Sequence, residues 1–114
     1  MDPILIIEDC QEVRDAVRSW TKKYKVQVEV PDTLEEVKEL LKKTWPMVLC
    51  DYDIKMWTGE ETGVDLMTEY IKLPGTSKAK IKDISGVQTG AFNVFGIEHM
   101  GKGRMFEYLK NLNQ

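Results

Sequence analysis

Two kinds of hydrophobic pattern alternate along the first two thirds of the chain. Short, unbroken apolar runs, Ile4–Ile7 and Met47–Cys50, are separated by stretches in which apolar residues recur every three or four positions. An unbroken run of this length is typical of a strand covered on both faces, whereas a spacing of three and four is typical of a helix with one buried face. The pattern therefore predicts strands that alternate with helices.

The spacing places the individual elements. Apolar stripes predict a helix over Gln11–Tyr24 and another over Val64–Ile71. Thr33-Leu34-Glu35-Glu36 has the form of a capping box, so a further helix is expected to begin there and to run to about Thr44. Valines alternate with polar residues over Val26–Val30, the pattern of a half-exposed strand at the edge of a sheet.

The last third of the chain has a weaker pattern. Residues 81–84 contain two isoleucines but also Lys82 and Asp83, which is too charged for a comfortable central strand. Ile97–Met100 predicts a short fifth strand, and Met105–Leu112 carries the stripe of a last helix. Gly86–Gly96 has three glycines and no clear period, so a full helix is not expected there.

This alternation defines a fold class. Repeated strand–helix units imply a parallel sheet with helices on both faces and right-handed crossovers, which is an α/β fold. A chain of 114 residues is expected to form one domain over residues 1–114. In such folds ligands bind beyond the carboxyl ends of the strands.

Three acidic residues fall at those strand ends. Glu8 and Asp9 follow the first apolar run, and Asp51 follows the run that ends at Cys50. Carboxylates brought this close repel one another, so the site either keeps one of them protonated or recruits a cation. Mg²⁺ is the natural partner, because it binds one or two carboxylates and leaves positions open for a phosphoryl oxygen.

Charge and composition exclude several classes of function. Sixteen Lys and Arg against nineteen Asp and Glu give a net charge of −3, which argues against a dedicated nucleic-acid binder. No apolar run is long enough for a membrane span and the chain does not begin like a secretory signal, so a cytoplasmic protein with no membrane contact is expected. Cys10 and Cys50 lack the spacing of a redox or zinc motif and are expected to be free thiols.

The ordered set of residues resembles the receiver domain of two-component response regulators. Glu8 and Asp9 match the acidic pair of that family, Asp51 matches its phosphoacceptor, Lys102 matches its lysine, and Ser85 best matches its hydroxyl residue. The supporting motifs are Ile4 to Asp9 followed by Gln11-Glu12-Val13-Arg14, Thr62-Gly63-Val64-Asp65-Leu66-Met67, and His99-Met100-Gly101-Lys102-Gly103. The resemblance spans the chain and is strongest up to Tyr70.

The resemblance implies a fold and a partner set. Receiver domains have a flavodoxin-like (βα)₅ three-layer sandwich with a parallel sheet in the order 2-1-3-4-5. They accept a phosphoryl group from a sensor histidine kinase or a phosphotransfer protein and signal to a downstream protein. Such a domain is not an enzyme beyond its own phosphorylation and dephosphorylation. The length leaves no room for a DNA-binding domain, so a stand-alone domain that acts through protein contact is expected.

The resemblance also assigns roles at the site. Asp51 would take the phosphoryl group, Lys102 would pair with its carboxylate, and the Ser85 hydroxyl would bind a phosphoryl oxygen. Mg²⁺ would be held by Asp9 and Asp51, by Glu8 through water, and by the main-chain carbonyl of Asp53.

Some features depart from the family pattern. The segment between Asp51 and Gly63 is longer than usual, and the segment between Ser85 and Lys102 is shorter, so the fourth helix is expected to be shortened or missing. Thr89 is an alternative to Ser85 as the hydroxyl residue. The shortened segment keeps open a second function, a receiver-like scaffold that binds a partner without phosphorylation switching.

Overall fold

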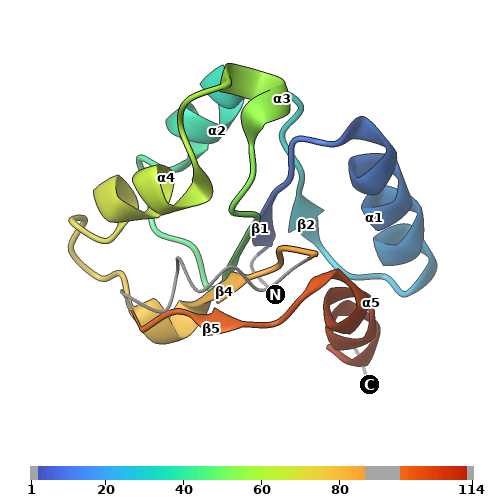
Figure 1. The fold of residues 1–114 in the computed structure, drawn as a ribbon. Helices are drawn as coiled ribbons and strands as arrows, with labels where there is room; N and C mark the ends of the chain where they lie inside the picture. Colours follow the sequence, from blue (N-terminus) through green and yellow to red (C-terminus); the bar gives the residue numbers. More distant parts are fainter. Residues whose placement is uncertain (1–2, 87–95, 113–114) are drawn as a thin grey trace.

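The structure is a computed structural model that describes residues 3–86 and 96–112. Its strands are β1 (Ile4–Ile7), β2 (Val28–Glu29), β3 (Val48–Cys50), β4 (Ile81–Asp83) and β5 (Glu98–His99). Its helices are α1 (Gln11–Lys23), α2 (Leu34–Leu40), α3 (Lys55–Thr58), α4 (Gly63–Tyr70) and α5 (Lys102–Asn111), with a 3₁₀ turn at Lys78–Lys80. The strands form one parallel sheet in the order β2-β1-β3-β4-β5, which confirms the expected flavodoxin-like α/β fold (Figure 1).

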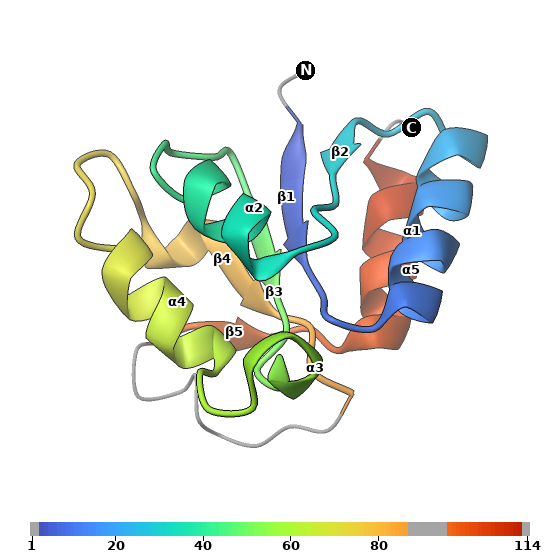
Figure 2. The ribbon, with the colours of Figure 1, turned by 90° about the horizontal axis from the view of Figure 1, so that it is seen from above.

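Helices cover both faces of this sheet and create two cores. Helices α1 and α5 lie on one face, and α2 and α4 lie on the other (Figures 1 and 2). Side chains alternate along β1, so Ile4 and Ile6 pack with Val17 of α1, whereas Leu5 and Ile7 belong to the core with Val37 of α2. The resulting three layers match the expected sandwich.

Local sequence signals explain where most elements begin and end. Thr33 caps α2 by accepting a hydrogen bond from the Glu36 amide, which is one half of the predicted capping box, whereas the Glu36 carboxylate accepts the Thr33 hydroxyl instead of the Thr33 amide. The Thr62 hydroxyl caps α4 by accepting the Asp65 amide, and the Thr62 amide donates to the Asp65 carboxylate, which completes a capping box. Strand β2 is short and lies at the edge beside β1, as expected for its alternating pattern.

Helix α2 is shorter than predicted, because it ends at Leu40 rather than near Thr44. The amides of Lys42 and Lys43 bond to carbonyls three residues earlier, so the chain tightens into turns after Leu40. The Leu40 carbonyl accepts the Lys43 amide in one of these turns and also accepts the indole N–H of Trp45, at 2.8 Å. Trp45 is buried between α2 and α4, consistent with a core position.

The prediction that residues 81–84 are too charged for a central strand is wrong. Strand β4 lies between β3 and β5. Lys82 is tolerated because it pairs with Glu98 of the neighbouring β5 at 3.0 Å. Asp83 is buried but accepts hydrogen bonds from the amide and hydroxyl of Ser85, so its carboxylate is not left unsatisfied.

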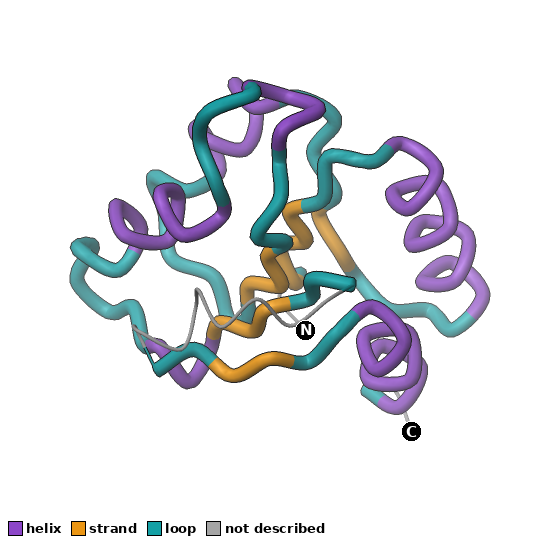
Figure 3. Tube along the Cα trace, viewed as in Figure 1, coloured by secondary structure: helices purple, strands orange, loops and turns teal. Residues whose placement is uncertain are grey.

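The long segment after β3 contains a short helix, α3, that the hydrophobic pattern did not predict. Figure 3 shows this helical turn between β3 and α4, and Figure 2 places it at the end of the sheet where β3 ends. The indole N–H of Trp57 donates to the Asp32 carbonyl at 3.0 Å, which ties α3 to the chain that precedes α2. Trp57 thus anchors this segment to the rest of the domain.

Three further predictions can be compared with the structure. Cys10 is half-buried and Cys50 is buried, and both are free thiols, as expected. The expected loss of the fourth helix concerns residues 87–95, which lie outside the described residues, and Thr89 lies there too. Within residues 3–86 and 96–112, no helix has the length and apolar character needed to cross a membrane.

Candidate functional site

The three predicted acids meet at the carboxyl edge of the sheet. Strands β1 and β3 are parallel neighbours with Ile7 opposite Cys50, so the residues that follow them leave the sheet side by side. Glu8, Asp9 and Asp51 each offer a carboxylate oxygen within 4.8 Å of the others, and all three residues are less than one tenth exposed. The structure therefore forms the acidic cluster expected from the sequence.

Among the three acids, Glu8 has the least favourable environment for a negative charge. Its residue is 1% exposed, and within the described part of the chain its Oε2 has no hydrogen-bond partner. The nearest cation to that oxygen is Lys102 Nζ, at 3.5 Å. Burial and the contact with Asp51 raise the pKa of Glu8 to about 8.

Asp9 is held by the unexpected helix. The main-chain amide of Met56 in α3 donates to Asp9 Oδ2 at 2.9 Å. Burial raises the pKa of Asp9, although this amide stabilises its charged form. Helix α3 thus fixes the orientation of one acid in the cluster, which the sequence did not reveal because a single turn has no measurable hydrophobic period.

Lys102 is the basic residue in contact with the cluster. It is the first residue of α5, and its Nζ lies 3.1 Å from Asp51 Oδ2. Gly101 precedes it with a φ of 82°, a backbone conformation that favours glycine and turns the chain from β5 into α5. Burial disfavours its charge, but the carboxylates of Glu8 and Asp51 outweigh this effect and raise the pKa of Lys102, so the side chain is a cation.

Ser85 lies beside the same cluster. It follows β4, and its hydroxyl accepts a hydrogen bond from the amide of Tyr52, the residue after Asp51, at 3.1 Å. The same hydroxyl donates to the Asp83 carboxylate. The imidazole Nε2 of His99 lies 3.1 Å from the Ser85 carbonyl, which can only accept, so this nitrogen carries the proton.

Asp53 differs from the other predicted residues because its side chain is not part of the buried trio. It is exposed, and its carboxylate accepts the amide of Lys55 at the start of α3. Its own amide lies 3.4 Å from Asp51 Oδ1. The main-chain carbonyl expected to bind the metal stays a prediction.

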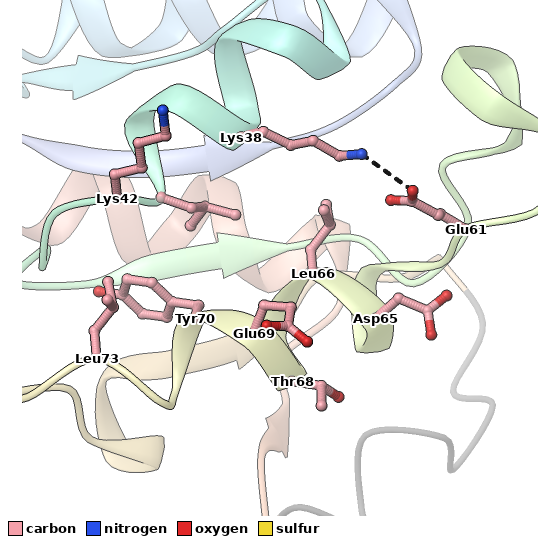
Figure 4. A pocket seen from close by; sticks show the side chains of 10 residues that line it. Lys38, Lys42, Glu61, Asp65, Leu66, Thr68, Glu69, Tyr70 and Leu73 are labelled. Carbon is pink, nitrogen blue, oxygen red and sulfur yellow. Dashed lines mark hydrogen bonds and ion pairs between the residues drawn. The ribbon is translucent and has the colours of Figure 1, made fainter.

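The cluster opens to solvent through a hollow of about 510 Å³ that also reaches Ser85, Lys55 and Met56. A larger hollow, of about 630 Å³, lies between α2 and α4 (Figure 4). Its floor is apolar, and Lys38 reaches across it to Glu61 at 3.1 Å. None of the clustered acids lines the larger hollow, so the candidate functional site is the smaller one.

The donor set of the smaller hollow fits a small, hard cation. Three carboxylates, one of them with an oxygen that accepts no hydrogen bond, supply the oxygen ligands that Mg²⁺ prefers. The adjoining Lys102 and Ser85 supply a cation and a hydroxyl for an anionic ligand. The arrangement can therefore hold a divalent ion next to an anionic ligand.

The chain has the fold of a CheY-like receiver domain. A response regulator receiver domain (CheY-like) from Methylobacillus flagellatus matches 76% of this chain and 71% of its own, with a TM-score of 0.58 and 17% sequence identity. A sensor protein from Polaromonas sp. JS666 matches 95% of this chain and 92% of its own, with a TM-score of 0.68 and 13% identity. No family model and no curated protein matches the sequence. At these identities the similarity is one of fold, and the chemistry is argued from the residues.

Proposed function

We propose that this chain is a phosphoacceptor receiver domain of a two-component phosphorelay. Asp51 accepts a phosphoryl group from the phosphohistidine of a sensor histidine kinase or a phosphotransfer protein, and the domain then signals by contact with a downstream protein. The observation that carries the proposal is the pairing of Asp51 Oδ2 with Lys102 Nζ at 3.1 Å within a buried cluster of three carboxylates. The domain catalyses at most its own phosphorylation and dephosphorylation.

The transfer step uses Asp51 as the nucleophile. A carboxylate oxygen of Asp51 forms a bond to phosphorus, and the bond between phosphorus and the donor imidazole breaks. The imidazole nitrogen leaves with the electron pair, and Asp51 becomes an acyl phosphate. Lys102 holds the Asp51 carboxylate before transfer and lies close enough to pair with a phosphoryl oxygen afterwards.

The acidic residues would hold Mg²⁺ in this reaction. Asp9 and Asp51 would bind through their carboxylates, Glu8 through water, and Asp53 through its main-chain carbonyl. When bound, the ion supplies positive charge that offsets the repulsion between the carboxylates and the incoming phosphoryl oxygens. The Glu8 oxygen that accepts no hydrogen bond supports this assignment, because the Lys102 ammonium, 3.5 Å from it, is shared with Asp51 and cannot by itself balance three buried carboxylates.

Ser85 would convert the new charge into movement. Its hydroxyl is positioned in the same hollow as Asp51 and Lys102 and can bind a phosphoryl oxygen by turning away from Asp83. Such a turn shifts the chain after β4, and with it the contact between the Ser85 carbonyl and His99. This movement is the signal that a downstream protein would detect.

Intact-protein mass spectrometry tests the proposal. We expect incubation with acetyl phosphate and Mg²⁺ to add one phosphoryl group to the wild-type protein, and the addition to disappear without Mg²⁺ and in Asp51→Asn. Asp15→Asn is the matched control, because Asp15 is an exposed aspartate that pairs with Arg18 on α1. Undiminished uptake by a folded Asp51→Asn variant contradicts the proposal.

The same experiment distinguishes the phosphoacceptor domain from the second candidate function. A receiver-like scaffold that binds its partner without switching would bind Mg²⁺ but take up no phosphoryl group. Magnesium binding by wild type, measured by calorimetry, together with no gain of mass would therefore favour the scaffold.

A further inference from the structure

A buried carboxylate outside the acidic cluster hydrogen-bonds to the hydroxyl at the site. Asp83 is the last residue of β4, lies between β3 and β5, and is 2% exposed. Its Oδ1 accepts both the amide of Ser85, at 2.9 Å, and the hydroxyl of Ser85. Asp83 is not one of the clustered acids, and the transfer step described above does not use it.

These contacts occupy the Ser85 hydroxyl on both sides. A serine hydroxyl has one proton, and in this structure that proton points to Asp83. Its oxygen accepts the Tyr52 amide at the same time. The hydroxyl can therefore donate to a phosphoryl oxygen on Asp51 only after its bond to Asp83 breaks.

Breaking that bond has a cost that depends on the charge of Asp83. A hydrogen bond to a carboxylate is roughly twice as strong as one between neutral groups, and a buried carboxylate that loses a donor is left less satisfied. The Asp83 backbone is itself fixed, because its carbonyl accepts the amides of Met100 at 2.7 Å and Gly101 at 3.1 Å. Asp83 thus provides a rigid acceptor that competes with the phosphoryl group.

We propose that Asp83 is a positioning residue that holds the Ser85 hydroxyl in its resting orientation and sets how readily this hydroxyl turns to a phosphoryl group on Asp51. The inference rests on the proposed function. It predicts a resting state that is more strongly held than one in which the Ser85 hydroxyl has a neutral acceptor. It also makes the turn between β5 and α5 part of the switch, since Asp83 bonds both to Ser85 and to the amides of Met100 and Gly101 in that turn.

A double-mutant cycle tests the inference. Asp83→Asn keeps the shape and an acceptor oxygen but removes the charge, so we expect phosphorylation by acetyl phosphate with Mg²⁺ to become about fivefold faster, the difference between a charged and a neutral hydrogen bond. In the Ser85→Ala background the same substitution should leave the rate nearly unchanged, because the hydroxyl that Asp83 holds is absent. A purely structural role would change the rate by the same factor in both backgrounds.

The outcomes distinguish the inference from the proposed function. No phosphorylation of wild type would overturn both. Phosphorylation of wild type with an equal effect of Asp83→Asn in the two backgrounds, or with no effect in either, would overturn the role of Asp83 alone.

A measurement on wild-type protein answers the same question if Asp83→Asn does not fold. The ¹³C chemical shift of the Asp83 carboxylate reports its hydrogen bonds. We expect it to move when Mg²⁺ and beryllofluoride, a phosphoryl mimic, are added, because the Ser85 hydroxyl leaves. An unchanged shift in protein that binds beryllofluoride would overturn the inference.

Discussion

The environment of Glu8 indicates what kind of ligand the site binds. It lies at the end of a central strand, is almost fully buried, and has an oxygen to which no described residue hydrogen-bonds and which has only the Lys102 ammonium near it, at 3.5 Å. A protein selected only for stability would replace such a group by an apolar one. Lys102 supplies one positive charge to three carboxylates, so the buried Glu8 is explained if a further cation binds at the cluster.

Glu8 also predicts how stability depends on pH. Its pKa in the folded protein, about 8, lies above the ordinary value of 4.5, so between these values the folded protein binds more protons than the unfolded chain. The contribution of Glu8 to stability is fully present below pH 4.5 and is lost as the pH rises through about 8. Urea unfolding in the presence of a chelator should therefore show falling stability across this window.

A matched pair of variants isolates this effect. Glu8→Gln removes the titrating group and should flatten the pH dependence, leaving a smaller slope of the same sign from Asp9, whose pKa is also raised. Glu12→Gln changes an exposed glutamate of α1 and should keep the wild-type slope. Wild-type stability that rises with pH in this window would show that the Glu8 carboxylate is already neutralised by a group of the chain itself.

Among the elements, the start of α4 is the most tightly constrained by the site. A methyl group at Gly63 would lie 2.0 Å from the Asp51 carbonyl oxygen and 3.0 Å from Cys50 Sγ, so α4 can approach β3 this closely only with glycine. We expect Gly63→Ala to lower the free energy of unfolding by about 2 kcal/mol or more, because backbone must shift. Gly103→Ala in α5 has no atom within 4 Å of the new methyl group and is the control in urea unfolding. Equal stability of the two variants would contradict the close approach.

Helix α3 should report on metal binding. Its Met56 amide bonds to Asp9, and its Trp57 ring lies 5.5 Å from the Arg14 guanidinium, which in turn donates to the Glu8 carbonyl. We expect millimolar Mg²⁺ to change the tryptophan fluorescence, and the change to vanish in Trp57→Phe, which leaves Trp20 and Trp45. An equal change in Asp9→Ala would show that the signal does not come from the acidic cluster.

Elements with long periodic patterns could be predicted from the sequence, and those determined by tertiary contacts could not. Helix α1 and the buried strand β3 followed directly from apolar spacing. Strand β4 was misjudged because partners outside the strand satisfy its charges. Lys82 pairs with Glu98, which is distant in the sequence, and Asp83 accepts hydrogen bonds from Ser85. Helix α3 was missed because it is four residues long and is held by bonds to Asp9 and Asp32 rather than by a stripe of its own.

For the whole molecule, sheet order turns distant sequence positions into one site. Asp51, Lys102 and Ser85 are far apart in the chain, but the order β2-β1-β3-β4-β5 delivers them to the same edge. Sequence spacing and a family resemblance were sufficient to name these residues. Their hydrogen-bond partners, above all Asp83 for Ser85, could be found only from the folded arrangement.

The central claim concerns which atom accepts the phosphoryl group, and chemical trapping tests it most directly. Borohydride reduces an acyl phosphate to an alcohol and would convert a phosphorylated Asp51 into homoserine, which peptide mass spectrometry locates. After treatment with acetyl phosphate and Mg²⁺, we predict homoserine at position 51 and unmodified Asp9 and Asp53. Homoserine at Asp9 or Asp53 instead, or no homoserine in protein that has gained the mass of a phosphoryl group, would contradict the assignment of Asp51 as the phosphoacceptor.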